Sequence, residues 1–139
     1  MIHNFEEYTH NMTMAEKKYI LPQIIRILSL AIGKEKAITN NQIIENIILP
    51  SINEYPESLN LNMSRIRHII HVLRVSDTIP YLVASSKGYY ISNDREEIET
   101  YIKSIDDRLR SIYQIRKALR RQTKNFSNKQ TDSQQRLIL

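Results

Sequence analysis

The chain has 139 residues, of which 41% are hydrophobic, enough for one domain with a modest core and an appendage but not for two independent domains. Two glycines, eight tyrosines and two phenylalanines, against 23 isoleucines, favour a mainly helical protein over a turn-rich β-sandwich. The net charge of +5 is unevenly placed: residues 1–60 carry −2 and residues 61–139 carry +7, which favours a polyanionic partner for the second half.

Membrane insertion and export are not indicated by the sequence. No stretch approaches the roughly 18 consecutive apolar residues that cross a bilayer. The first ten residues, MIHNFEEYTH, lack the basic start and apolar middle of a signal peptide. We therefore expect a cytoplasmic protein with no membrane partner. Cysteine is absent, which excludes disulfides and thiolate metal sites.

The N-terminal part predicts an arm followed by a helix. Residues 1–17 show little periodicity and are expected to form an N-terminal arm. Between Lys18 and Ile32 apolar residues recur at helical spacing, which predicts the first helix. Pro22 fits the first turn of that helix, and Gly33 fits its C-terminal cap, where a positive φ is favoured.

A short strand and a second helix are expected next. Ala37 and Ile38 predict the strand, and Thr39 is a suitable N-cap for a helix over Asn40–Ile48. The link that follows, residues 49–63, is unusual because helix-to-helix connections span about 2 to 8 residues. We interpret it as an insertion.

The segment from Ser64, SRIRHIIHVLRV, predicts a basic third helix with a buried stripe at i, i+3, i+4, i+7 spacing. Two strands, Ile79–Ala84 and Gly88–Ile91, predict a short hairpin, with Pro80 at the start of an edge strand. Helix, short strand, helix, helix and hairpin is the order of a winged helix-turn-helix domain, which we place at residues 18–92. The buried stripe of the third helix consists of Ile66, Ile69, Ile70 and Leu73.

Residues 93–121 predict a long C-terminal helix that starts at a capping pair, Asn93 and Glu96. Its apolar residues keep a heptad-like register, which Arg116 interrupts. At about 42 Å it is longer than a small domain covers, so we expect a homodimer, with packing back across its own domain as the alternative. The polar residues 122–139 predict a flexible tail. The predicted dimerisation residues are Ile98, Ile102, Ile105, Leu109, Ile112 and Leu119.

An exposed basic helix beside a hairpin is an arrangement that reads the grooves of DNA. With its apolar residues facing inward, the third helix turns polar and basic residues outward, where they can contact bases and phosphates. Lys87 at the hairpin tip can reach the backbone or the minor groove, and the start of the second helix can hold a phosphate. The predicted DNA-binding residues are Thr39, Asn40, Asn41, Gln42, Ser64, Arg65, Arg67, His68, His71, Arg74, Ser85, Ser86 and Lys87.

Other chemistries are poorly supported. His68 and His71 lie three residues apart on one helix face, but no carboxylate or cysteine completes a metal site, so we expect neither a metal nor another cofactor. Adjacent carboxylates in the C-terminal helix point about 100° apart and form no acid/base pair, and the chain lacks phosphate-binding-loop and nucleophile-elbow motifs. We therefore expect no catalysis. Tyr89 and Tyr90 alternate across a strand, which favours packing over base stacking, with one of them in the core.

Several of these segments resemble a known family. Thr39 with Ile43, then the basic helix from Ser64, the hairpin tip SSKGYY and the long acidic-capped helix resemble the small winged-helix proteins of phages and prophages over residues 20–120. The resemblance implies double-stranded DNA binding in phage replication or gene control, in the host cytoplasm if the protein is phage-encoded. We therefore expect a non-enzymatic double-stranded DNA-binding protein that acts in transcriptional regulation or as a replication accessory factor. The alternative is a winged-helix protein-interaction module that recruits a partner through the C-terminal helix or the tail.

Overall fold

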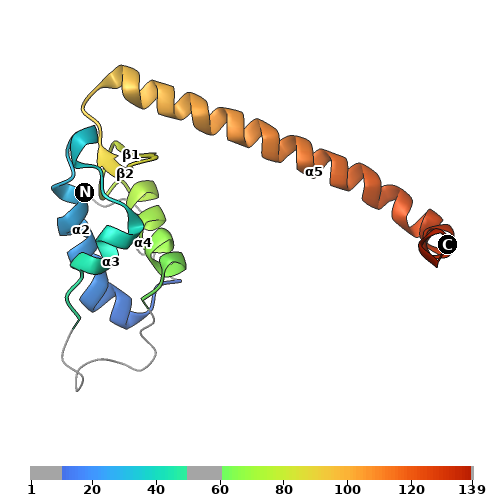
Figure 1. Cartoon of the computed structure of the whole chain (residues 1–139), viewed down its shortest axis with the longest axis horizontal. Coiled ribbons are helices and arrows are strands. Elements are labelled where there is room, and N and C mark those ends of the chain that lie inside the picture. The colour runs from blue at the N-terminus through green and yellow to red at the C-terminus, as the bar shows by residue number, and fades with distance from the viewer. Residues whose placement is uncertain (1–10, 50–60, 139) are drawn as a thin grey trace. The chain divides into compact units, whose positions relative to one another are not determined.

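The computed structural model describes residues 11–49 and 61–138, with side chains described as far as Phe126 (Figure 1). It separates into two units, residues 1–98 and 99–139. The first ten residues of the predicted arm and most of the predicted insertion lie outside the described residues. None of the described helices has an apolar stretch long enough to cross a membrane.

Helical structure begins earlier than the sequence predicted. A π-helical segment, η1 (Glu16–Ile20), leads directly into α2 (Leu21–Ser29), and Thr13 caps the first turn by accepting a hydrogen bond from the Glu16 N–H. Met12 and Glu16 are both buried. The end of the predicted 1–17 arm is therefore part of the folded unit, because the buried side chains of Met12 and Glu16 belong to its interior. Pro22 lies in the first turn of α2, as expected.

Gly33 has a different role from the one predicted. It was expected to cap the first helix, but α2 ends at Ser29 with Leu30 as its C-cap. Gly33 has the expected positive φ of 92°, and its N–H donates to the carbonyl of Ile91 before the short 3-10 helix η2 (Lys34–Lys36). Its conformation therefore serves the contact with the hairpin rather than the end of α2.

The second and third helices form largely as predicted. Thr39 caps α3 (Asn40–Asn46), and its side chain and that of Gln42 bond reciprocally to each other's backbone N–H. The N-cap of α4 (Met63–Val75) is Asn62, whose side chain accepts from the Arg65 N–H. The four predicted core residues of α4 are buried, together with Val72. Because α3 ends at Asn46, it is slightly shorter than predicted.

The hairpin is the expected wing, with a third segment added to one edge. Strands β1 (Leu82–Ser85) and β2 (Gly88–Ile91) pair antiparallel. Ile38 exchanges two backbone hydrogen bonds with Tyr89, at 2.9 and 2.8 Å, so β2 lies between β1 and the segment before α3. The first strand starts later than predicted, because Tyr81 has a φ of 63° that interrupts an extended backbone.

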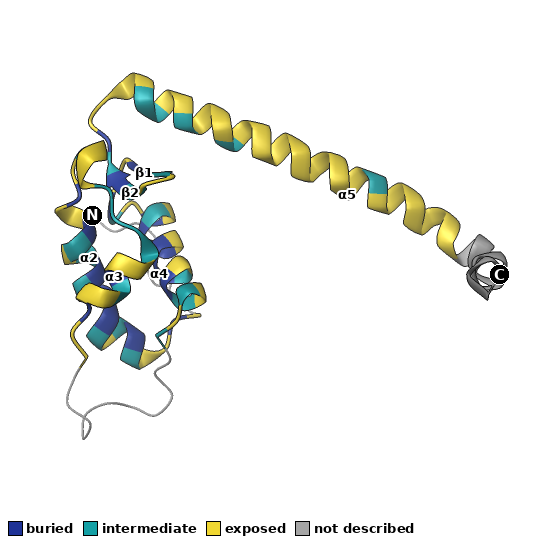
Figure 2. Cartoon of the chain, in the orientation of Figure 1, coloured by how far each residue is buried: buried dark blue, intermediate teal, exposed yellow. Residues whose placement is uncertain are grey.

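These elements enclose one aliphatic core, drawn dark blue in Figure 2. The order α2, bridging segment, α3, α4, hairpin is that of a winged helix-turn-helix domain, so the predicted fold class is confirmed. Helices α2, α3 and α4 all contact one another. The core residues with the least exposure are Ile20, Ile24, Leu28, Ile43, Ile66, Ile69, Ile70, Val72 and Leu73.

The last helix is α5 (Arg95–Ile138). Asp94, rather than the predicted Asn93, precedes its first turn, and the Asp94 carboxylate accepts from the Glu96 N–H at 3.0 Å. The helix does not end near residue 121 as predicted but continues to Ile138. No glycine or proline occurs after residue 121, and a low content of apolar residues does not by itself stop a helix.

Candidate nucleic-acid interface

The solvent-facing side of α4 carries the basic residues of the predicted interface. Ser64, Arg67 and His71 are exposed and lie at i, i+3, i+7, on one face of the helix. Arg74 continues this face and is half-buried, as is His68 at its edge. No Asp or Glu occurs anywhere in α4, so nothing within the helix offsets its positive charge.

Arg65 is placed differently from its predicted role. Its Nε and Nη2 atoms donate to the two carboxylate oxygens of Glu16 at 2.8 and 2.6 Å, and Nη2 also donates to the carbonyl of Asn11. The side chain of Glu16 is only 4% exposed and that of Arg65 32%. Arg65 therefore joins the N-terminal segment to α4 and does not belong to the exposed basic face.

The electrostatics of this pair agree with its geometry. Burial by itself raises the pKa of the Glu16 carboxyl, but the hydrogen bonds from Arg65 and from the Thr13 backbone outweigh it, so the pKa lies below its ordinary value. The carboxylate accepts from the Thr13 N–H at 2.9 Å as well as from Arg65. Glu16 is thus a charged, satisfied buried group. Sequence reasoning missed it, although Thr13 and Glu16 have the spacing of a capping box.

The wing tip presents Ser86 and Lys87 to solvent. Ser85 closes the turn: its hydroxyl donates to the carbonyl of Gly88 at 3.2 Å and accepts from the Lys87 N–H at 3.1 Å. The Ser85 side chain is therefore used within the hairpin, whereas Lys87 is exposed.

The start of α3 is less open to a phosphate than the sequence suggested. The reciprocal cap of Thr39 and Gln42 already satisfies the N–H groups of both residues. Asn40 is half-buried, and its Oδ1 atom accepts no hydrogen bond from any residue that the structure describes. Asn41 is exposed. Of the four residues predicted here, Asn41 is the one whose side chain is both exposed and outside the cap.

The two hairpin tyrosines face opposite sides of the wing. Tyr90 is buried, and Tyr89 packs against the main core, so the prediction that one tyrosine belongs to the core is confirmed. Burial raises the pKa of Tyr90 to about 12, with a further contribution from its hydrogen bond to the Glu97 carboxylate. The hydrogen bonds from Tyr90 and Ser92 in turn hold the pKa of Glu97 below its ordinary value. This cluster joins the wing to the first turn of α5.

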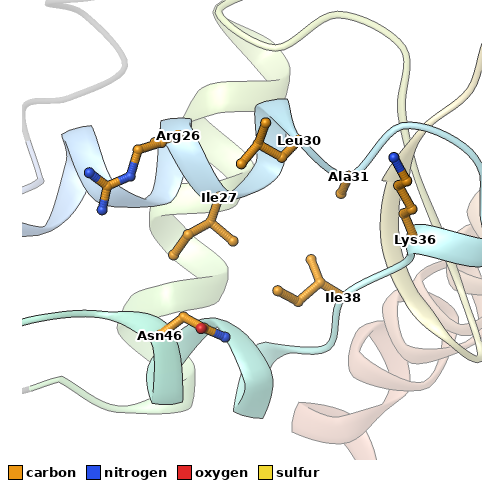
Figure 3. A pocket seen from close by; sticks show the side chains of 7 residues that line it. All are labelled: Arg26, Ile27, Leu30, Ala31, Lys36, Ile38 and Asn46. Carbon is orange, nitrogen blue, oxygen red and sulfur yellow. The ribbon is translucent and has the colours of Figure 1, made fainter.

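A groove of about 380 Å³ lies between α2 and α3 (Figure 3). Ile27, Leu30 and Ile38 give it an apolar wall, and Arg26 and Lys36 add two cations. None of the predicted DNA-binding residues lines this groove. It is therefore a feature separate from the basic face of α4.

Among the described residues, no group of three His, Cys, Asp or Glu side chains is arranged to hold a metal ion. The remaining candidate interface consists of the outer face of α4, with the exposed Ser64, Arg67 and His71 and the half-buried Arg74, and of the wing tip with Ser86 and Lys87. We call these six residues the basic surface. Comparison of the chain with protein-family models, curated proteins and solved structures gives no match.

Proposed function

We propose that the chain is a non-enzymatic double-stranded DNA-binding protein of the phage or prophage type. The observation that carries the proposal is the outer face of α4, which carries Arg67, His71 and Arg74 and no acid, followed by a wing whose tip exposes a lysine. A winged helix-turn-helix domain binds DNA with such a helix in the major groove. Two phage roles fit, in transcriptional regulation or as a replication accessory factor, and both place the protein in the host cytoplasm.

The proposed contacts follow from the side chains of the basic surface. Arg67 lies in the exposed N-terminal half of α4, where a guanidinium can bond two acceptors of a guanine. His71 lies one turn further on and can donate or accept near a base edge. Lys87 at the wing tip neutralises a backbone phosphate and releases condensed counterions.

Mobility-shift titrations of duplex DNA at several salt concentrations test this proposal. Affinity is expected to fall steeply as salt rises. Replacing Arg67 with Ala should cost about 1 to 3 kcal/mol on a preferred site and relax selection at one base pair, whereas Lys87→Ala should weaken all duplexes alike and lower the salt slope. Arg26→Ala is the matched control, because Arg26 is exposed on α2 outside the basic surface.

Unchanged DNA binding of the variants would contradict the proposal. If Arg67→Ala and Lys87→Ala are folded and bind duplexes as Arg26→Ala does, α4 and the wing do not form the DNA interface. If the proposal holds, selection of fragments from the native genome separates the two phage roles. A recurrent inverted repeat supports gene control by a dimer, and enrichment at one origin supports the replication role.

A second function is favoured by one observation, the exposed apolar side chains along α5. In that alternative the winged helix is a scaffold, and α5 or the tail recruits a protein partner. The same titrations distinguish the two functions, because the interaction module binds no duplex even at low salt. We further propose that the chain is a homodimer through α5, with Ile98, Ile102, Ile105, Leu109, Ile112 and Leu119 in the contact.

A further inference from the structure

The apolar residues of α5 follow a heptad repeat beyond the point where the sequence was expected to become flexible. With Ile102 and Leu109 at position a, position d is occupied by apolar residues throughout the described side chains. Between Ile98 and Phe126 the polar residues of the seam are Arg116 and Thr123, and Arg95, the first residue of α5, also falls at position a. Several of these apolar side chains are more than half exposed, for example 58% for Leu109 and 64% for Phe126. Figure 2 draws most of the coloured part of α5 as exposed. The residues at position d are Ile98, Ile105, Ile112, Leu119 and Phe126.

The charges of α5 are separated along its length. Residues 95–107 contain five acidic and two basic residues, a net charge of −3, and residues 108–124 contain seven basic residues and no acidic one. Arg116, Lys117, Arg120, Arg121 and Lys124 gather with Tyr113 on one face of the second segment. Two parallel copies of this helix would set like charges side by side, whereas two antiparallel copies set the acidic segment of each against the basic segment of the other.

We propose that α5 binds α5 of a second copy of this chain in the antiparallel direction, through its heptad seam. The proposal rests on the homodimer proposed above and not on DNA binding. The two directions differ in which flanks of the seam meet: position e meets position e of the partner in an antiparallel pair, and position g in a parallel pair.

Position e is occupied by Glu99, Asp106, Tyr113 and Arg120. In an antiparallel pair with its two-fold axis near residues 110–114, the acidic residues of position e, Glu99 and Asp106, lie on the side of Arg120 of the partner subunit. Because the pair is symmetric, each dimer contains this contact twice. In a parallel, in-register pair Asp106 would lie beside Tyr101 of the partner subunit, and Arg120 beside Ile115 of the partner subunit, so no opposite charges meet. Position e therefore favours the antiparallel direction.

Arg116 at position a gives the same answer independently. A parallel pair sets position a against position a, which would bring two Arg116 guanidinium groups together inside the seam. An antiparallel pair sets position a against position d, so that Arg116 packs beside an apolar residue near the partner's acidic segment. Arg116 thus disfavours the parallel direction and is compatible with the antiparallel direction.

Distance measurements between labelled copies test the direction. The chain has no cysteine, so Thr100→Cys or Gln114→Cys introduces a single labelling site, and both residues are exposed at position f, away from the seam. In the full-length antiparallel dimer, spin labels at residue 114 are expected within about 10 Å along the helix axis and labels at residue 100 about 30 to 40 Å apart. Equal short distances at the two sites would overturn the antiparallel direction but not the dimer. A monomer in light scattering would overturn both the dimer and its direction. DNA binding is tested separately.

Charge reversal supplies a second test with a matched control. Reversing both acids of position e, Glu99→Arg with Asp106→Arg, should raise the dimer dissociation constant about tenfold, and adding Arg120→Glu should restore most of the loss. Glu96→Arg with Asp107→Arg makes the same change in net charge outside the seam and is expected to shift the constant by about twofold. Circular dichroism checks that all variants remain helical. If the control weakens the dimer as much as the position e variant does, or if Arg120→Glu restores nothing, the paired flank is wrong.

Discussion

The ion pair between Glu16 and Arg65 gives the sharpest prediction about stability. Arg65→Met keeps the helical propensity and much of the side-chain volume but leaves the 4% exposed Glu16 carboxylate without its two guanidinium hydrogen bonds. Removing one partner of a buried pair costs about 3 to 5 kcal/mol. Because the Arg65 side chain is 32% exposed, solvent screens the pair, and we expect a loss of about 2 to 3 kcal/mol in the free energy of unfolding.

In a thermal melt followed by circular dichroism, this loss should lower Tm by about 10 to 20 °C for a domain of this size. Arg67→Met, which changes an exposed arginine of the same helix, is the control and should stay within about 0.5 kcal/mol of the parent. Adding Glu16→Met to Arg65→Met should recover part of the loss, because the uncompensated charge is removed with its partner. Equal melting curves for Arg65→Met and Arg67→Met would refute the structural role of Arg65.

The same pair predicts a dependence on pH. Since the pKa of Glu16 in the folded chain lies below its ordinary value, the pair stabilises the fold above that ordinary pKa, and its contribution disappears as the pH falls through the lowered pKa. The difference in stability between the parent and Arg65→Met should therefore shrink in acid. Chemical denaturation at a series of pH values measures this difference directly. A difference that stays constant down to pH 2 would contradict the assignment.

Three further predictions concern the wing and its neighbours. Gly88→Ala should cost about 3 kcal/mol in chemical denaturation, because Gly88 has a φ of +119° and an added Cβ would lie 2.3 Å from the Ile38 carbonyl; a loss below 1 kcal/mol would contradict this. Thr39→Ala should cost about 1 kcal/mol by removing the cap of α3, measured in the same way, whereas Thr39→Ser should be nearly neutral. In an absorbance titration Tyr90 should ionise near its pKa of about 12, with stability falling as pH rises above 10, and Glu97→Gln should lower that midpoint.

The sequence predicted helices and strands well where a local pattern of apolar or β-forming residues determines the element. The apolar spacing of α4 and the β-forming residues on either side of Ser86 and Lys87 are local features, and both elements occur, although β1 starts at Leu82 rather than at Ile79. The fold class followed from the order of these elements. The end of α5 was missed because the prediction treated polarity as a stop signal, whereas helix termination depends on residues that break or cap the backbone.

The candidate site was only partly predictable, because some side chains bond to residues that are far away in the sequence. Arg65 and Glu16 are 49 residues apart, and no local spacing in the sequence indicates their contact. Without it Arg65 is indistinguishable from Arg67 in sequence. Gly33 shows the same limit: its positive φ was expected, but its bond to Ile91 is a tertiary contact that only the folded chain displays.

The position of β2 has a consequence for how the wing moves. Ile38 and Tyr89 exchange both of their backbone hydrogen bonds, and the Ile91 N–H donates to Ala31 at 2.7 Å, so β2 is a central strand and β1 is the edge. In amide hydrogen exchange the N–H groups of Ile38, Tyr89 and Ile91 should open only with global unfolding of this unit, while those at the hairpin tip exchange through local opening. The wing is therefore not an independent flap: its base and the turn that leads into α3 form one cooperative folding unit, and only the tip with Lys87 is free to adjust to a bound surface.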